Sequence, residues 1–289
     1  MIRFLLAIAL LLSGCSSRHS RFIVDPFWVN AHPQALLVEA SWTPADAKRD
    51  YDVGHIPNAV HLNTDDFETP RPDWLLRPLP ELQRIIGHDL GIGSSTTVVV
   101  YSSKTIAAAR VWWILYYAGV KDVRILNGGF EGWIRAGYLN DTKPHRRPPV
   151  RFEAKPRASI LASTADVANR GDAPLLVDVR SLDEYAGRTS GYSYLAAKGR
   201  IPGAIHAEDA DDSAAVYQKP DGTLRPVDEI RKLWVVRGLL SGKQRPLIFY
   251  CGSGWRSSLA FLYAAEMGLT DIRNYSDGWT GWNAPDKRE

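Results

Sequence analysis

The two halves of this chain repeat each other, and this internal repeat constrains the fold more than any other feature. Tyr101-Ser102 in the first half aligns with Tyr250-Cys251 in the second. At the same offset and without a gap, further identical residues pair: Gly119 with Gly268, Asp122 with Asp271, Arg124 with Arg273, Gly129 with Gly278, Gly132 with Gly281, and Trp133 with Trp282. A chain of 289 residues has room for two domains of ordinary size. The repeat therefore predicts two homologous domains.

A second pair of matching segments lies upstream of the first. His55-Ile56-Pro57-Asn58-Ala59-Val60-His61 corresponds to Arg200-Ile201-Pro202-Gly203-Ala204-Ile205-His206. The offset differs here, as expected of loop insertions, and the segment between Arg180 and Arg200 is longer than its counterpart in the first half.

Short apolar runs alternate with helical patterns along both halves. Residues 36–39, 98–101, 175–179 and 247–250 are expected to form buried parallel strands, and residues 106–118, 230–236 and 257–267 to form helices. This alternation is typical of α/β domains. Residues 140–157 are rich in proline and basic side chains, which indicates a linker. The predicted domains therefore span residues 22–139 and 158–289.

Cys251 is the residue with the most reactive setting in the sequence. An apolar run ends at Tyr250, and a helical pattern follows the segment Cys251-Gly252-Ser253-Gly254-Trp255-Arg256. A helix N-terminus offers unpaired N–H groups and a partial positive charge, and glycines let such groups converge on an anion. Arg256 adds a fixed positive charge. The alternative is an inert buried cysteine, which explains neither the two glycines nor the arginine, so we expect a thiolate nucleophile.

The length of this loop separates two chemistries. Cysteine phosphatases have a longer loop between cysteine and arginine, and position 257 here is serine. A smaller ring of N–H groups suits one sulfur atom better than a phosphate. The loop therefore favours sulfur chemistry, and an arsenate or phosphate enzyme remains as a less favoured alternative.

Several motifs, in the correct order, resemble the rhodanese family of sulfurtransferases. Cys251-Gly252-Ser253-Gly254-Trp255-Arg256 is similar to the loop of its periplasmic multi-domain thiosulfate sulfurtransferases. The other matching segments are Leu176-Val177-Asp178-Val179-Arg180, Gly199-Arg200-Ile201-Pro202-Gly203-Ala204, the turn Pro220-Asp221-Gly222-Thr223, and Tyr275-Ser276-Asp277-Gly278-Trp279 with Trp282. The resemblance implies an α/β fold of two tandem rhodanese-like domains, each a mainly parallel sheet flanked by helices.

The resemblance also implies a mechanism. Cys251 would take a sulfur atom from thiosulfate or a similar anionic donor, carry it as a persulfide, and pass it to cyanide or a thiol without any cofactor. Arg256 would orient the loop or bind the donor, with Gly252, Ser253, Gly254 and Trp255 lining the substrate site. Arg180 corresponds to a donor-binding arginine, although an ion pair with Asp183 or Glu184 is the competing role.

Arg188 is a further candidate for substrate binding. Its segment departs in length from that of 3-mercaptopyruvate enzymes, and Trp255-Arg256 replaces their usual Val-Thr. Both departures disfavour 3-mercaptopyruvate as the donor.

The first domain lacks the residues of this chemistry. Ser102 stands in place of Cys251, Thr105 in place of Gly254, and Ala107 in place of Arg256. An alcohol cannot hold a sulfane sulfur, and a serine nucleophile would need a base and an oxyanion hole. The first domain is expected to be catalytically inactive and to wall one side of the cleft.

The first residues resemble a bacterial lipoprotein signal. Nine apolar residues follow Arg3 and lead to Leu12-Ser13-Gly14-Cys15, which is too short to span a bilayer. The resemblance implies removal of residues 1–14, lipidation of Cys15 and a tether over 15–21. The expected location is the periplasmic face of the outer membrane. Ordinary cleavage that leaves a free Cys15 is the alternative.

Composition excludes other functions. Two cysteines without metal spacing argue against a metal site. A net charge of +3 without a basic stripe argues against nucleic acid. A protein acceptor is compatible with the sequence, so the competing hypothesis is a persulfide carrier that docks on a partner without turning over.

Overall fold

The computed structural model describes residues 20–42, 49–70, 73–207 and 215–284. Residues 1–14, which we expect to be a signal sequence, lie outside the described residues, as do Cys15 and most of the expected tether 15–21. In the part described, no helix has the length and apolar character needed to cross a membrane.

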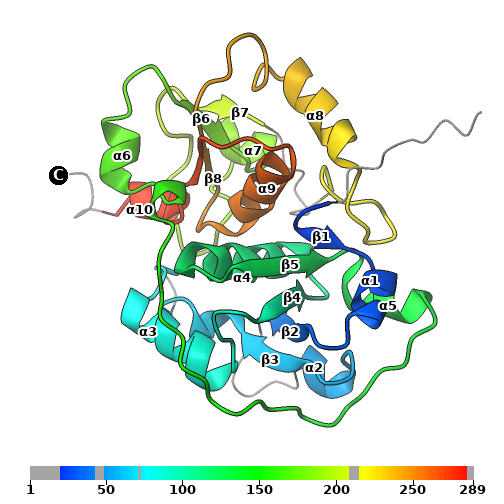
Figure 1. Ribbon diagram of the computed structural model, residues 1–289. Helices are drawn as coiled ribbons and strands as arrows, with labels where there is room; N and C mark the ends of the chain where they lie inside the picture. Colours follow the sequence, from blue (N-terminus) through cyan, green and yellow to red (C-terminus); the bar gives the residue numbers. More distant parts are fainter. Residues whose placement is uncertain (1–19, 43–48, 71–72, 208–214, 285–289) are drawn as a thin grey trace, which may run out of the picture.

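The first domain is built on a parallel sheet with helices on both sides (Figure 1). Its five described strands have the order β1-β5-β4-β2-β3 and pair in parallel throughout. The strands are β1 Ile23–Val24, β2 Leu36–Ser41, β3 Val60–Asn63, β4 Thr97–Tyr101 and β5 Asp122–Leu126. The helices are α1 Pro26–Ala31, α2 Asp50–Val53, η1 Thr64–Asp66, α3 Leu79–Arg84, η2 Ile85–Asp89, α4 Thr105–Ala118 and α5 Gly129–Arg135.

The second domain repeats this plan with four described strands in the order β7-β6-β8-β9, again all parallel. The strands are β6 Leu175–Asp178, β7 Ile205–His206, β8 Leu247–Tyr250 and β9 Ile272–Asn274. The helices are η3 Ala158–Ile160, α6 Thr164–Ala168, α7 Leu182–Tyr185, α8 Val227–Val236, α9 Trp255–Glu266 and α10 Gly278–Trp282. The predicted α/β fold class with mainly parallel sheets is confirmed.

The same local contacts recur in the two domains, which explains the repeat physically. The Tyr101 hydroxyl accepts a hydrogen bond from the Ile56 N–H at 3.0 Å, and the Tyr250 hydroxyl accepts one from the Ile201 N–H at 3.3 Å. A Cβ atom on Gly129 would lie 2.4 Å from the carbonyl oxygen of Ser102. On Gly278 it would lie 2.5 Å from the carbonyl oxygen of Cys251. The repeated glycines are therefore fixed by close approach of the backbone.

Helices α4 and α9 pack against each other between the two sheets (Figure 1). Buried aromatic residues fill this contact, with Phe261 of α9 against Trp112 and Trp113 of α4. One apolar cluster runs from the first sheet through both helices to the second sheet. The Ser102 loop leads into α4, and the Cys251 loop leads into α9. Packing of α4 on α9 therefore brings both loops to the domain interface.

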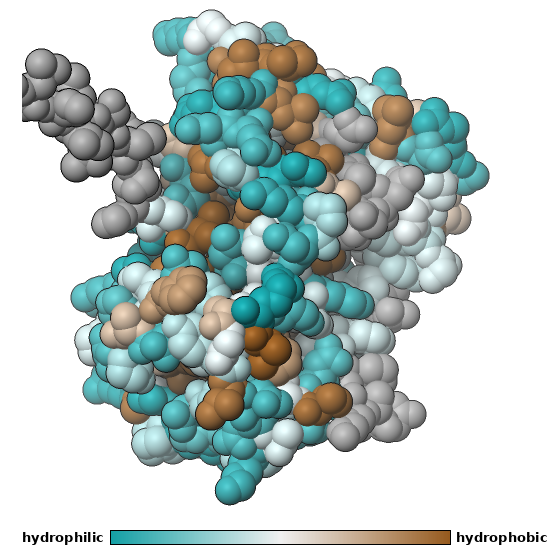
Figure 2. Space-filling model, turned by 90° about the vertical axis from the view of Figure 1, so that its right-hand side faces the viewer, coloured by the Kyte–Doolittle hydropathy of each residue, from teal (hydrophilic) through white to brown (hydrophobic). Residues whose placement is uncertain are grey.

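Residues 143–157 contain no described helix or strand and pass around the first domain (Figure 1). They are held by backbone contacts such as the Val150 N–H on the Gly87 carbonyl at 2.9 Å and the Lys155 N–H on the Ala118 carbonyl at 3.0 Å. The surface in Figure 2 is largely hydrophilic, with apolar residues scattered between polar ones.

Candidate active site

Cys251 lies at the junction between strand β8 and helix α9. β8 ends at Tyr250 and α9 begins at Trp255, so Gly252, Ser253 and Gly254 form the whole connection after the cysteine. Gly254 precedes the first helical turn with a φ of 89°, in the left-handed region that favours glycine. The predicted strand, tight loop and helix start are therefore present. The helix begins two residues earlier than expected, which places Trp255 and Arg256 in its first turn.

Gly252 is constrained by packing rather than by its backbone angles. A Cβ atom at this position would lie 2.1 Å from the Tyr192 hydroxyl oxygen. On α10, the Trp279 N–H donates to the Cys251 carbonyl at 2.7 Å and the Thr280 N–H to the Gly252 carbonyl at 3.0 Å. Within the described residues, the N–H groups of Gly252 and Ser253 donate to no backbone carbonyl. They are available to an anion.

The Cys251 side chain is enclosed. The residue is 2% exposed, and the Ser257 Oγ lies 3.6 Å from its Sγ. The Ser257 hydroxyl also donates to the Asn274 Oδ1 at 2.7 Å. A sulfur atom that reaches Cys251 therefore meets the loop N–H groups and an ordered hydroxyl oxygen rather than bulk water.

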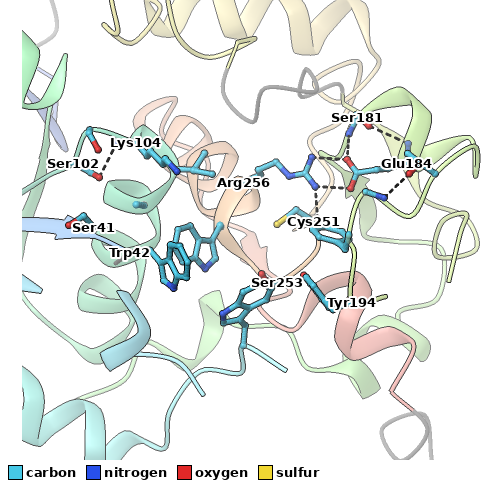
Figure 3. Close-up of a pocket in the computed structure, with 18 of the residues that line it drawn as sticks. Ser41, Trp42, Ser102, Lys104, Ser181, Glu184, Tyr194, Cys251, Ser253 and Arg256 are labelled. Atoms are coloured by element: carbon cyan, nitrogen blue, oxygen red, sulfur yellow. Dashed lines mark hydrogen bonds and ion pairs between the residues drawn. The ribbon is translucent and has the colours of Figure 1, made fainter. Parts of the chain in front are cut away.

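Arg256 is held by a carboxylate (Figure 3). Its Nη1 and Nη2 donate to the two carboxylate oxygens of Glu184, both at 2.8 Å, with the two side chains 10% and 5% exposed. Glu184 is fixed in turn by a capping box with Ser181 at the start of α7. Burial alone would raise the pKa of Glu184, but the hydrogen bonds and charge of Arg256 hold this pKa below its usual value. The ion pair is thus intact at neutral pH.

Tyr192 completes this wall of the site. Its hydroxyl oxygen accepts a hydrogen bond from Arg256 Nη2 at 2.5 Å. Burial holds the pKa of Tyr192 well above its usual value, although the charge of Arg256 opposes the shift. Tyr192 therefore stays a neutral phenol beside the loop.

A pocket of about 800 Å³ opens over Cys251 between the two domains. Figure 3 shows Trp42 and Lys104 of the first domain facing Cys251 and Tyr194 of the second. The aromatic residues of the lining are Trp42, Trp74, Tyr192, Tyr194 and Trp255. The charged residues of the lining are Asp50, Lys104, Asp183, Glu184 and Arg256. As expected, the first domain forms one wall of the cleft.

The other two predicted arginines are not brought to this pocket. Arg180 is fully buried, and its guanidinium pairs with Asp178, at 3.0 Å from Nε and 2.7 Å from Nη2. The partner is therefore neither Asp183 nor Glu184, because Asp178 lies two residues away on the same strand end. Arg188 is mainly exposed and pairs with Asp183. Neither arginine lines the pocket.

The corresponding loop of the first domain carries no comparable chemistry. Ser102 Oγ accepts a hydrogen bond from the Lys104 N–H at 3.1 Å. In the described residues no hydrogen bond connects Ser102 with a side-chain base. The same part of the chain contains no cluster of residues suited to a metal ion.

Sequence reasoning missed four residues beside the Cys251 loop, and on the pocket lining it also missed Trp42, Trp74, Lys104 and Tyr194. Glu184 and Ser181 carry a visible signal, because Ser181-x-x-Glu184 is a capping-box pattern. Tyr192 and Ser257 carry none, since their roles depend on loops and turns that meet only in the folded chain.

Fold and loop together define a protein of two tandem α/β domains. The loop of the second domain carries a thiol beside N–H groups that suit an anion, and the equivalent loop of the first domain has no thiol. A rhodanese-like domain model matches residues 31–136 and 163–285, so the chain belongs to the rhodanese-like family.

The relatives are proteins of sulfur transfer. The chain is 36% identical to the thiosulfate sulfurtransferase YnjE of Escherichia coli, over 93% of this chain and 65% of that protein. It is 32% identical to the sulfur carrier protein TtuD of Thermus thermophilus, over 91% and 94% of the two chains. Other relatives are named 3-mercaptopyruvate sulfurtransferases. The chain thus spans about two thirds of the length of YnjE.

A solved structure with the same arrangement is the anaerobic ergothioneine biosynthesis enzyme of Chlorobium limicola in complex with its natural substrate trimethyl histidine. The TM-score is 0.82 and the identity 34%, over 92% of this chain and 69% of that one.

Proposed function

We propose that the protein is a sulfurtransferase that moves a sulfane sulfur from thiosulfate through a persulfide on Cys251 to a thiophilic acceptor. The observation that carries this proposal is the Cys251 loop. It presents a thiol beside free N–H groups in a pocket between the domains. Names of relatives that transfer or carry sulfur support the same reaction class.

The reaction has two displacement steps. The Cys251 thiolate attacks the outer sulfur of thiosulfate, the sulfur–sulfur bond of the donor breaks, and its electron pair leaves with sulfite. An acceptor nucleophile then attacks the terminal sulfur of the persulfide and restores the thiolate. With cyanide the product is thiocyanate, and ping-pong kinetics are expected.

Arg256 acts in this scheme by holding the loop. Its guanidinium is engaged with Glu184 and Tyr192, which fixes the first turn of α9 next to the sulfur. Among the described residues of the lining, the other cation is Lys104, contributed by the first domain. We assign Lys104 to the sulfonate end of the donor.

Sulfite release and mass spectrometry test the proposal together. After treatment with thiosulfate, the Cys251 peptide should carry one additional sulfur atom, and a Cys251→Ser protein should neither gain sulfur nor release sulfite. Normal sulfite release by Cys251→Ser would sink the mechanism. A parallel assay with 3-mercaptopyruvate separates the two donors, and we expect thiosulfate to be preferred.

A non-enzymatic persulfide carrier is the competing function. Cys251 is 2% exposed, so an acceptor must enter the pocket to reach it. This enclosure favours a small acceptor and repeated turnover. A carrier would load one sulfur and stop in the presence of cyanide, whereas the enzyme would cycle.

A ring-bearing organic acceptor is a second candidate for the sulfur. Five of the described residues that line the pocket are aromatic. In the ergothioneine enzyme, a tyrosine replaced in one solved variant precedes the persulfide cysteine by the same number of positions as Tyr192 precedes Cys251. Turnover of a persulfide-loaded protein with trimethyl histidine, compared with cyanide, tests this acceptor. Loss of the persulfide to cyanide alone would exclude it.

We also propose that Cys15 is lipidated and holds the protein at the periplasmic face of the outer membrane. The support is the segment Leu12-Ser13-Gly14-Cys15 after an apolar run. Metabolic labelling with a palmitate analogue should mark the parent protein and leave Cys15→Ala unmarked. Equal labelling of both would contradict the anchor.

A further inference from the structure

The first domain, which lacks a thiol, places a buried ion pair against the loop that carries Cys251. Arg110 of α4 donates from Nε to the Glu68 Oε1 at 2.7 Å, and the two side chains are 1% and 0% exposed. The second carboxylate oxygen of Glu68 accepts a hydrogen bond from Trp255 Nε1 at 2.8 Å. One carboxylate therefore connects Arg110 with the first residue of α9.

Arg110 also contacts the second domain directly, at two places. Its Nη2 donates to the Ser276 Oγ at 2.9 Å, and Ser276 is 1% exposed. A Cβ atom on Gly254 would lie 2.6 Å from Arg110 Nη1 and 2.8 Å from the Ser276 carbonyl oxygen. The guanidinium thus packs directly against the glycine that caps α9.

The repeat provides an internal comparison for this ion pair. Leu259 of α9 occupies the position that Arg110 has in α4. The Gln218–Leu224 bridge of the second domain corresponds to the Glu68–Leu76 bridge of the first. Gln218 donates to the Gly222 carbonyl of its own turn at 2.7 Å. Among the described residues, the Cys251 loop therefore packs against an ion pair from the other domain. The equivalent positions for the Ser102 loop carry an amide, Gln218, and an apolar side chain, Leu259.

Stability alone does not explain the pair. Burying two charges costs several kcal/mol of desolvation, which the attraction between them often fails to exceed. Burial raises the pKa of Glu68, although the charge of Arg110 and the hydrogen bond from Trp255 oppose the shift. A carboxylate whose folded pKa exceeds its unfolded value lowers the stability of the fold when it ionises near neutral pH.

We propose that Glu68 and Arg110 are positioning residues for sulfur transfer. They fix Trp255 and Gly254 from the first domain, so that the free N–H groups of the loop stay aimed at the transferring sulfur. The inactive domain is thereby part of the machinery of the active one. This inference rests on the proposed sulfurtransferase function.

Hydrogen exchange tests the positioning without any substrate. Glu68→Gln keeps the size of the side chain but offers one acceptor oxygen instead of two, so it must lose either Arg110 or Trp255. In the full-length protein, we expect exchange in the first two turns of α9 to rise about tenfold, measured by mass spectrometry. Exchange in α8, which lies away from the pair, should not change.

Kinetics test the consequence for catalysis. Glu68→Gln should lower kcat for sulfite release about tenfold or more, with KM for thiosulfate within about twofold, because the pair touches the loop and not the donor. Arg110→Lys can still pair with Glu68 but cannot also reach Ser276, so its kcat should fall between those of the parent and Glu68→Gln.

A matched control separates positioning from general loosening of the interface. Phe261→Leu thins the same α4–α9 contact through the rings of Trp112 and Trp113. It should lower Tm and preserve kcat. The inference would be overturned if Glu68→Gln showed unchanged hydrogen exchange in α9 and a kcat within twofold of the parent. If Glu68→Gln does not fold, the same result in Arg110→Lys would overturn it. Absence of sulfite release by the parent would instead refute the proposed donor, and the exchange result would still decide the positioning.

Discussion

At the scale of single residues, the site depends on the absence of a side chain as much as on charge. Gly252 lets the Tyr192 ring close over the loop, because any Cβ would overlap the Tyr192 hydroxyl. Tyr192 accepts from Arg256, so a displaced ring would also disturb the guanidinium. Close packing and electrostatics act on the same few atoms.

Gly252→Ala should therefore abolish most of the activity without unfolding the protein. The added methyl group must push Tyr192 and the loop apart, and a displacement of about 1 Å at a reacting centre costs on the order of 100-fold in rate. Steady-state sulfite release measures this loss. Gly93→Ala is the matched control, because Gly93 has no left-handed φ and a Cβ there would make only ordinary contacts, 3.7 Å from Thr96 Oγ1 and 3.8 Å from Val150 Cγ2. Equal sulfite-release activity in the two alanine variants would contradict the packing argument.

The Arg256–Glu184 pair predicts a particular response to acid. The folded pKa of Glu184 lies below its unfolded value, so its contribution to stability is complete above about pH 4.3 and is lost as pH falls through the folded pKa. Glu184→Gln should cost about 3 kcal/mol at neutral pH, since it leaves the buried Arg256 cation without a counter-charge. Denaturant unfolding between pH 6 and pH 3 should show this difference shrinking. A constant difference would contradict the assignment.

Lys104 is the residue through which the first domain would touch the donor. Removing its charge by Lys104→Met should raise KM for thiosulfate about tenfold and leave kcat nearly unchanged, because one charge contact of about 1.4 kcal/mol is lost. Lys121→Met is a control, since Lys121 is an exposed lysine away from the pocket lining. An unchanged KM in Lys104→Met would remove Lys104 from the donor site.

At the scale of elements, much of the fold was predictable from the sequence. The apolar runs 36–39, 98–101, 175–179 and 247–250 all form parallel strands, because continuous hydrophobic runs are stable where helices cover both faces of a sheet. Helices were expected at 106–118, 230–236 and 257–267, and each is present with a start one to three residues earlier. The first turn of a helix is hard to predict, because its residues continue the preceding loop and do not follow the apolar pattern of the helix.

The start of α7 offers a test of an element that was not predicted. The Ser181 hydroxyl accepts from the Glu184 N–H at 3.2 Å, and the Ser181 N–H donates to the Glu184 carboxylate at 3.0 Å. Ser181→Ala should cost about 1 kcal/mol of stability and lower kcat, because the cap orients the carboxylate that holds Arg256. Ser163→Ala, the same capping box at α6, should cost similar stability but no activity. Equal activity losses in both would contradict this role.

At the scale of the whole molecule, long-range contacts set the limit of what the sequence could reveal. Arg180 was expected near the donor but pairs with Asp178, and no local pattern distinguishes these outcomes. Glu68 reaches Trp255 across 187 positions, and Arg110 reaches Ser276 across 166. A charged residue inside the apolar run 106–118 was the one visible sign that α4 contacts something polar.

The same contacts explain why the chain keeps a domain without a thiol. The pocket over Cys251 has walls from both domains, and a single apolar cluster joins them through α4 and α9. The first domain supplies Trp42 and Lys104 to the pocket and the Glu68–Arg110 pair to the loop. The first domain has a serine instead of a thiol at position 102, yet it contributes to the site of the second domain.

Mass spectrometry of the Cys251 peptide, after one exposure of the intact protein to thiosulfate, tests the central proposal most directly. We predict one added sulfur atom on that peptide, released sulfite in equal amount, and return to the unmodified mass when cyanide is added. A Cys251 peptide of unchanged mass in a protein that still releases sulfite would contradict the account.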